Sequence, residues 1–201
     1  MTPNLDHALF LARTALAFGR VNRITFHEDG ITSESDTDHT IMLALIAVDL
    51  APARLDPGDV ALYALVHDLV EVYAGDVQTL RISPEARTLK AEREARARDR
   101  LLGELGSKSS LAHYLYTYEM QKHPAARFVR LLDKVLPKLT HMSNACAAPK
   151  AMGLTPAEFL QSHSDQYATL LFEYPEFPET LQLLHDSMTA AEAAWGDHAL
   201  D

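Results

Sequence analysis

Apolar residues recur at helical spacing along almost the whole chain, and this spacing is what most constrains its fold. Near the N-terminus, Leu5, Leu9, Ala12 and Leu16 follow one another at intervals of three or four residues, and Gly19 ends the run. Such intervals place side chains on one face of an α-helix. No stretch alternates convincingly between apolar and polar residues with the period of a β-strand. The pattern therefore predicts an all-α fold of about eight helices.

Proline and capping residues mark where most of the predicted helices begin. Asp56 and Pro57 form one start signal, because aspartate caps a helix N-terminus and proline suits the first helical position. Thr155 and Pro156 form another. The predicted helices are, in order, residues 5–19, 37–50 (capped by Asp36 or Thr37), 57–75, 84–105, 110–122, a helix from 124 that runs past 133 with a kink at Pro137, and helices that begin at 156 and 178. Residues 20–36 and 143–153 are expected loops.

The length of the chain fits one domain. A chain of 201 residues can bury a substantial core, and no linker or repeat interrupts it. We expect a single globular domain over residues 1–201. Its core would come from about residues 15–140, and C-terminal helices within residues 155–195 would pack on that core.

The charge balance and the single cysteine narrow the partners and the compartment. The formal net charge is −10, which argues against binding a nucleic-acid polymer, since that needs a basic surface. A small anionic substrate would need a local cation. Cys146 is the only cysteine, so no intrachain disulfide forms and a cytoplasmic location is expected. The longest apolar run, residues 41–48, is too short to span a membrane, and residues 1–9 lack a signal-peptide pattern.

An adjacent His-Asp pair, His67 and Asp68, offers a divalent metal an imidazole nitrogen and a carboxylate oxygen. His39 lies at the start of an earlier helix, and Asp133 lies in an apolar stretch where a charge is costly unless it is paired or coordinated. Two nitrogens and two carboxylates would leave coordination positions open for water and substrate, as a catalytic metal requires. The set suits one divalent ion, Mn, Co, Fe, Ni or Zn, and Mg could also serve.

Four segments, in order, carry a resemblance to a known family. They are Asn22-Arg23, then Glu-Ser-Asp-Thr-Asp-His-Thr at residues 34–40, His-Asp-Leu-Val-Glu-Val-Tyr-Ala-Gly-Asp at residues 67–76, and Phe-Val-Arg-Leu-Leu-Asp-Lys at residues 128–134. This order of His, then His-Asp, then Asp resembles the HD-domain metal-dependent phosphohydrolases. The resemblance is closest to bacterial 5′-deoxynucleotidases and related HD-domain-containing proteins. It covers about residues 15–139.

The resemblance implies roles for individual side chains. The metal ligands would be His39, His67, Asp68 and Asp133. Arg23 would clamp the phosphate, Glu71 would manage the proton, and Asp76 would add a second carboxylate that holds a sugar hydroxyl. The spacing agrees for Glu71, because a residue four positions after His67 shares its face of the predicted helix. The implied activity is metal-dependent hydrolysis of nucleoside 5′-monophosphates, in particular 2′-deoxynucleotides, to nucleoside and phosphate.

Other functions stay open at this point. The chain could hydrolyse another small phosphoester, or it could be a di-iron HD oxygenase, which would need further ligating histidines such as His113 and His123. It could also be a non-catalytic helical module whose metal only stabilises the fold. The presence of Glu71, Asp76 and Arg23 argues against that last class, because a structural metal has no use for them.

Some features depart from the family pattern or leave its consequences open. Ile24 stands where some deoxynucleotidases have an aromatic residue, and residues 77–80, Val-Gln-Thr-Leu, lack the prolines of relatives. Relatives often form homodimers, and a C-terminal helix could supply the interface with Leu181, Leu184 and Trp195, although a core role is equally open. The remaining histidines are expected at the surface or the core edge: His7, His27, His163, His185 and His198.

Overall fold

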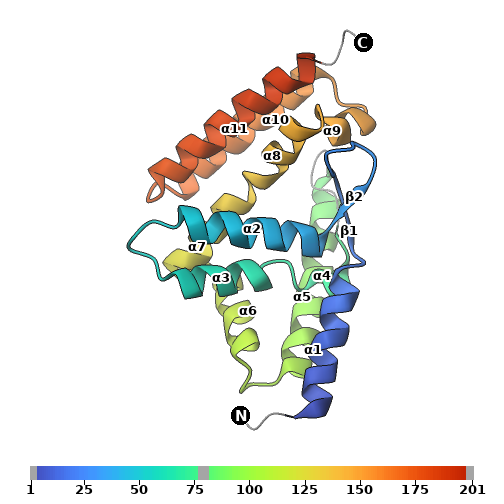
Figure 1. Ribbon diagram of the computed structural model, residues 1–201, viewed down its shortest axis with the longest axis vertical. Coiled ribbons are helices and arrows are strands. Elements are labelled where there is room, and N and C mark those ends of the chain that lie inside the picture. Colours follow the sequence, from blue (N-terminus) through green and yellow to red (C-terminus); the bar gives the residue numbers. More distant parts are fainter. Residues whose placement is uncertain (1–3, 77–81, 198–201) are drawn as a thin grey trace. The chain divides into compact units, whose positions relative to one another are not determined.

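The computed structural model describes residues 4–76 and 82–197, and within them helix predominates (Figure 1). This confirms the predicted helical fold. Contacts between residues group the chain into two compact units. Unit 1 comprises residues 1–23 and 35–126, and unit 2 comprises residues 24–34 and 127–201. The expectation of a single domain over residues 1–201 stays a prediction.

Unit 1 is built from six helices among its described residues, and α7 begins at its end. They are α1 (Leu5–Phe18), α2 (Asp36–Leu50), α3 (Pro57–Val66), α4 (Glu71–Ala74), α5 (Pro84–Leu105) and α6 (Ser110–Met120). α3 packs against both α2 and α6, and α4 packs against α5. Leu43 of α2, Val60 of α3 and Leu115 of α6 are fully buried. Burial of these apolar side chains holds α3, and the end of it that carries His67, in place.

A short hairpin replaces part of the loop expected over residues 20–36. β1 (Asn22–Phe26) pairs with β2 (Ser33–Ser35), and the turn between them closes with a hydrogen bond from the His27 N–H to the Thr32 carbonyl at 2.8 Å. Gly30 has a φ of +67° in this turn, a conformation that favours glycine. Strands of five and three residues are too short to show an alternating pattern, so these two strands could not be predicted from the sequence.

The helix expected over residues 57–75 is wrong as a continuous element. α3 ends at Val66, and α4 begins at Glu71. Between them the backbone tightens: the Leu69 N–H bonds the Val66 carbonyl and the Glu71 N–H bonds the Asp68 carbonyl, three residues back instead of four. Apolar periodicity does not separate these two bonding patterns, and such tight turns recur at functional positions. The His-Asp pair therefore lies in a turn between two helices.

Unit 2 contains most of α7 (Pro124–Asp133) and then α8 (Leu136–Ser143), α9 (Ala147–Ala151), α10 (Pro156–Glu173) and α11 (Pro178–Asp197). α11 packs against α8 and α10 (Figure 1). Leu181 and Leu184 are 3% and 0% exposed, so they serve the core of this unit and not a docking surface. Trp195 is partly buried against Cys146, Phe159 and Ala191.

Two further expectations about this region need correction. The helix starting at Pro124 does not run through a kink at Pro137; it ends at Asp133, and Pro137 lies in the first turn of α8, where a proline costs no hydrogen bond. The loop expected over residues 143–153 contains α9.

The two predicted helix caps fare differently. The Thr155 cap of α10 is confirmed. The cap of α2 in unit 1 is Ser35, one residue before the expected Asp36.

None of the helices in residues 4–76 and 82–197 combines the length and apolarity that a bilayer crossing needs.

A buried polar cluster joins α8, α10 and α11 within unit 2. Lys138 donates to the Gln166 side chain, and His163 Nδ1 lies 2.9 Å from Glu192 Oε1. His141 is also buried, and its ring contacts the ring of Phe159. The expectation that His163 lies at the surface or core edge is therefore wrong: its residue is 5% exposed. Burial, then the charge of Lys134, lowers the pKa of Lys138 to about 7.

Replacing Lys138 with methionine is expected to stabilise the protein near neutral pH. Lowering the pKa of a lysine from 10.5 to about 7 means that the charged amine destabilises the folded state by about 5 kcal/mol. Loss of the Gln166 hydrogen bond offsets part of this, so Lys138→Met should raise the free energy of unfolding by about 2–3 kcal/mol at pH 6.5.

The way the stability gain of Lys138→Met changes with pH tests whether the buried charge of Lys138 causes it. Above the unfolded pKa the amine is neutral in both states; as pH falls from 10.5 towards 7, the unfolded chain gains the proton first and wild-type stability drops. The gain from Lys138→Met, measured by urea unfolding, should therefore shrink between pH 7 and pH 10. Lys122→Met, at an exposed position, is the control. A gain independent of pH would contradict the account.

Candidate metal centre

His67 is fixed in the orientation that a metal ligand needs. Its Nδ1 lies 2.7 Å from the Ala64 carbonyl oxygen, and its side chain is 1% exposed. Because a carbonyl can only accept, Nδ1 carries a hydrogen, so Nε2 is the ring nitrogen that remains to bind a cation. Ligating histidines usually donate their second ring N–H in this way, which fixes the tautomer. Nε2 faces the carboxylate of Asp68.

Three of the predicted ligands come together within unit 1. His67 Nε2 and Asp68 Oδ2 are 3.0 Å apart, and the ring centroids of His39 and His67 are 5.4 Å apart. Ligand atoms of the three residues all lie within 4.8 Å of one another. With metal–ligand bonds of about 2.1 Å, two neighbouring ligands of an octahedral ion are about 3 Å apart, so the His67–Asp68 spacing fits one ion.

Asp133, the fourth predicted ligand, is the last residue of α7 and belongs to unit 2. Its residue is 8% exposed, and the Lys134 amine lies 2.6 Å from its Oδ2. A buried carboxylate beside a lysine amine suits a ligand whose charge is compensated further when a metal binds. Its role as the fourth ligand stays a prediction.

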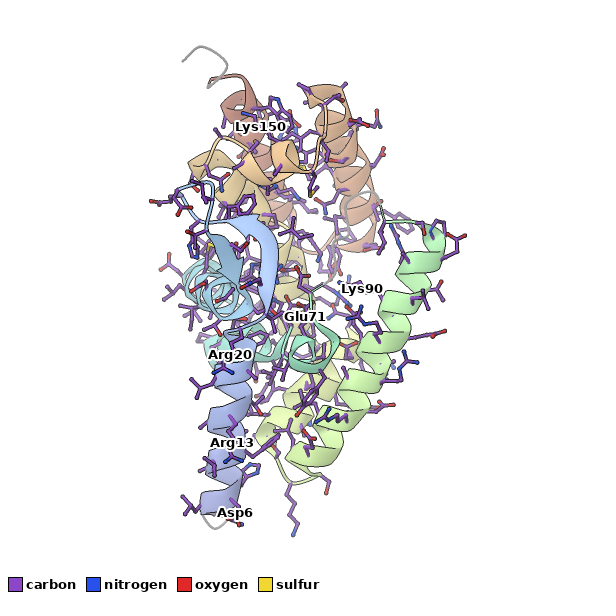
Figure 2. The ribbon with its side chains drawn as sticks, turned by 90° about the vertical axis from the view of Figure 1, so that its right-hand side faces the viewer. Asp6, Arg13, Arg20, Glu71, Lys90 and Lys150 are labelled. Carbon is purple, nitrogen blue, oxygen red and sulfur yellow. The ribbon has the colours of Figure 1, made fainter. Side chains whose placement is uncertain are left out.

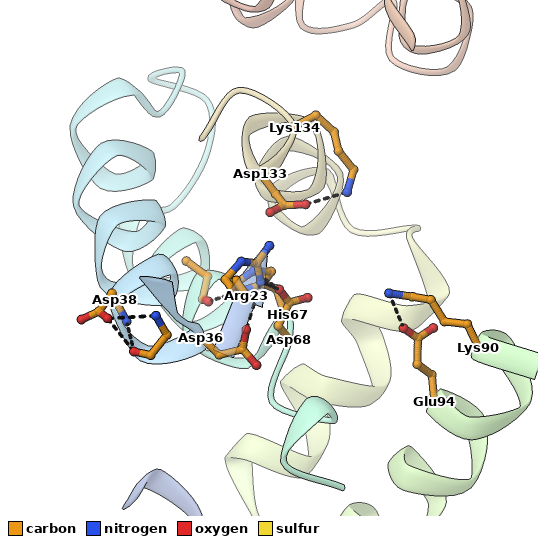
Figure 3. A network of polar contacts seen from close by, with 11 residues as sticks. Arg23, Asp36, Asp38, His67, Asp68, Lys90, Glu94, Asp133 and Lys134 are labelled. Carbon is orange, nitrogen blue, oxygen red and sulfur yellow. Dashed lines mark hydrogen bonds and ion pairs between the residues drawn. The ribbon is translucent and has the colours of Figure 1, made fainter. Parts of the chain in front are cut away.

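Arg23, the predicted phosphate clamp, contacts the His-Asp pair directly. Its Nη1 donates to Asp68 Oδ2 at 2.8 Å and to Asp36 Oδ1 at 3.1 Å (Figure 3). The side chain of Arg23 is 14% exposed and that of Asp36 is 0% exposed. One guanidinium nitrogen therefore bridges a predicted ligand and a fully buried carboxylate.

Glu71 begins α4, and its residue is 5% exposed. Burial raises the pKa of its carboxyl well above the ordinary value, and the charges of Asp68, Asp36 and Asp76 add to the effect. Lys90 of α5 lies nearby and opposes it (Figure 2). Without a bound cation, Glu71 therefore holds its proton at neutral pH. A protonated carboxyl beside the ligand atoms can act as a general acid.

The helix α5 holds the short helix that carries Glu71. Four residues are too few for a stable helix in isolation. The Tyr73 hydroxyl donates to Glu104, the Arg100 guanidinium lies 3.7 Å from the centre of the Tyr73 ring, and Arg93 donates to the carbonyl of Ala74. These bonds fix the α4 end that leads to Asp76.

Gly75 follows α4 with a φ of +70°, which L side chains rarely adopt, so a glycine is needed at this turn. Asp76 comes next, close enough for its charge to act on Glu71. The predicted loop difference at residues 77–80 lies outside the described residues.

Asp36 was missed by the sequence analysis. The sequence predicted it only as a candidate cap of the second helix. Its burial and its contact with Arg23 could not be read from the residue order. His113 and His123, the candidates for a second metal, join no group of three ligand atoms in the part of the chain that the structure describes.

The comparison with family models decides the relationship. The model of the HD domain matches residues 19–173. This chain belongs to the HD-domain family. The matched segment includes every site residue predicted from the sequence, from Arg23 to Asp133.

Two curated relatives of this HD-domain chain are named 5′-deoxynucleotidase HDDC2. The protein from Danio rerio is 29% identical over 107 residues, which cover 51% of each chain, and that from Homo sapiens is 30% identical over 101 residues, which cover 50% of each. The chain thus spans about half the length of the curated relatives it matches.

A solved structure shows the same fold. The protein, from Magnetospirillum magnetotacticum MS-1, carries the name predicted metal-dependent phosphohydrolase. It is 23% identical, with a TM-score of 0.69, and the match covers 94% of each chain. This likeness supports the HD-domain architecture.

Proposed function

We propose that this HD-domain protein is a metal-dependent phosphohydrolase that converts nucleoside 5′-monophosphates, in particular 2′-deoxynucleotides, to nucleoside and phosphate. The observation that carries the proposal is the contact of Arg23 with Asp68, whose carboxylate also lies 3.0 Å from His67 Nε2. The proposed cation ligand Asp68 and the proposed phosphate clamp Arg23 are thus in direct contact. The names of the HDDC2 relatives add support for the nucleotide substrate.

His39, His67, Asp68 and Asp133 would hold one divalent ion, and the contact of His67 Nδ1 with the Ala64 carbonyl oxygen leaves Nε2 for that role. A bound ion of this kind lowers the pKa of water and neutralises charge on phosphoryl oxygens. Mn, Co, Fe, Ni or Zn would satisfy two nitrogens and two carboxylates, and Mg could also serve.

The residues around the ligands would bind the phosphate, transfer the proton and bind the sugar. Arg23 would bind phosphate oxygens through its planar guanidinium and offset the charge that develops on them. Glu71 would give its proton to the leaving 5′-oxygen as the bond between phosphorus and that oxygen breaks, while the oxygen of water bonds to phosphorus and one proton of that water returns to Glu71. Asp76 would accept a hydrogen bond from a sugar hydroxyl. We expect this reaction in the cytoplasm, on a free small-molecule substrate.

A panel of nucleotides tests the substrate class. Phosphate release from the 2′-deoxy and ribo forms of the four 5′-monophosphates should occur with added Mn²⁺ or Co²⁺ and be faster for the deoxy forms. A 3′-monophosphate of the same nucleosides is the matched control and should react far more slowly. Equal rates on the 5′ and 3′ esters would show that another phosphoester is the substrate.

A di-iron oxygenase, the alternative enzyme class, would have a distinct signature. It would contain two irons per chain and show their absorption spectrum. A homodimer, also expected from relatives, would appear as twice the chain mass in light scattering; the burial of Leu181 and Leu184 means that its interface would have to use other residues.

A further inference from the structure

A buried carboxylate outside the predicted set lies against the proposed phosphate clamp. Asp36 is the first residue of α2, and its side chain is 0% exposed. Burying a carboxylate is costly unless it is paired. The start of α2 does not need this side chain, because Ser35 and Asp38 already form a complete capping box there. The burial of Asp36 therefore calls for another reason.

That reason is the guanidinium of Arg23. Nη1 of Arg23 divides its hydrogen bonds between Asp36 Oδ1 and Asp68 Oδ2. The same Asp68 oxygen faces His67 Nε2 at 3.0 Å, so it is the oxygen that a cation held by His67 would use. A cation there competes with Arg23 for Asp68 and also repels the guanidinium. The bond from Arg23 to Asp36 does not use the Asp68 oxygen, so it can persist when a cation binds there.

We propose that Asp36 is a positioning residue that keeps the Arg23 guanidinium at the site when a cation occupies Asp68. The inference rests on the proposed function in one respect, that Arg23 receives the phosphate. Asp36 accepts from a single guanidinium nitrogen, Nη1, and a planar guanidinium can bind a carboxylate and phosphate oxygens through different N–H groups. Asp36 thus orients Arg23 without touching the substrate.

The position of Glu71 agrees with this role. Ligand-capable oxygens of Asp36, Asp68 and Glu71 lie within 4.8 Å of one another, so three acidic groups share one small volume. Arg23 contacts two of the three and offsets their repulsion. The same three oxygens could in principle hold a cation of their own, and a metal titration separates that possibility from the proposal.

The direct test follows the mobility of the Arg23 side chain. In ¹⁵N-labelled protein, the Arg23 signal is assigned by its loss in Arg23→Lys, and the rate of guanidinium rotation is measured without metal and with saturating Mg²⁺. In the wild type, rotation should be slow in both states. In Asp36→Ala it should stay slow without metal, where Asp68 still holds Arg23, and become at least 10-fold faster with Mg²⁺.

Two further variants separate positioning from a structural effect. Asp36→Asn keeps an oxygen acceptor and should show an intermediate rate; it also serves if Asp36→Ala does not fold. Asp38→Ala removes the capping-box carboxylate from the same helical turn and should leave Arg23 restrained. Slow rotation in Mg²⁺-loaded Asp36→Ala, or two metal equivalents in the wild type against one in Asp36→Ala, would overturn the proposal. This readout does not depend on turnover, so it stands even if no nucleotide is hydrolysed.

A kinetic cycle then links the restraint to substrate. Asp36→Ala should raise the KM for a 2′-deoxynucleoside 5′-monophosphate by roughly 10-fold. In an Arg23→Ala background the same change should have little further effect on KM, because the two residues act as one unit. Independent, multiplicative losses would mean that Asp36 does not act through Arg23.

Discussion

Asp68→Ala is expected to abolish metal binding and phosphate release together. Asp68 is the residue on which the site converges, because its Oδ2 faces His67 Nε2 at 3.0 Å and accepts from Arg23 at 2.8 Å. Its loss removes one ligand and leaves the charge of Arg23 close to the remaining histidines. A ligated metal contributes several kcal/mol to such a reaction, so kcat/KM should fall by about 10³-fold or more.

Calorimetric titration with Mn²⁺ gives the second readout for this variant. The wild type should bind the ion, and Asp68→Ala should show no saturable binding at the same concentrations. Asp99→Ala is the matched control, because Asp99 is an exposed aspartate of α5 that pairs with Arg98. Metal affinity unchanged by Asp68→Ala would remove Asp68 from the ligand set.

Glu71→Gln is expected to lower kcat strongly while metal binding persists. The amide keeps the shape of the carboxyl but has no proton to give to the leaving oxygen. Loss of a general acid costs roughly 10²–10⁴-fold in rate, and KM should change little because Glu71 is not assigned to substrate binding. Steady-state kinetics with Mn²⁺ measures kcat and KM separately, and rapid-quench kinetics measures the chemical step. Glu92→Gln, on the solvated face of α5, is the control.

The stability of metal-free Glu71→Gln gives an independent check. The folded pKa of Glu71 lies well above the unfolded value of 4.5. Below that unfolded value both states are protonated; as pH rises above it, the unfolded chain loses its proton first, and wild-type stability falls. Urea unfolding between pH 5 and pH 8 should show this fall in the wild type and a weaker fall in Glu71→Gln. Parallel curves, with full activity, would remove Glu71 from the proton-transfer role.

Much of the site could be predicted because its residues lie in short, ordered motifs. His67 and Asp68 are adjacent, so their proximity follows from the covalent chain. The contact between His39 and His67 follows once two apolar helices pack, because both residues lie near the ends of those helices. The helix starts at Pro57 and Pro84 could be predicted because proline and its capping residue act locally.

What could not be predicted depends on backbone detail and on tertiary burial. The break between Val66 and Glu71 arises from a change of hydrogen-bond partner by one residue, which leaves the apolar pattern intact. The buried positions of Asp36 and Lys138 depend on which neighbours pack over them, and polar residues are expected at the surface by default. Buried polar groups are thus the features that the structure reveals and the sequence alone does not predict.

The measurement that tests the central claim most directly is phosphate release from a 2′-deoxynucleoside 5′-monophosphate by wild type and Asp68→Ala, assayed side by side. Both proteins are first stripped with a chelator and then supplied with Mn²⁺. The account predicts no release by either stripped protein, restored release by the wild type, and none by Asp68→Ala. Equal release by the two proteins, or release by the wild type that metal removal leaves unchanged, would contradict it.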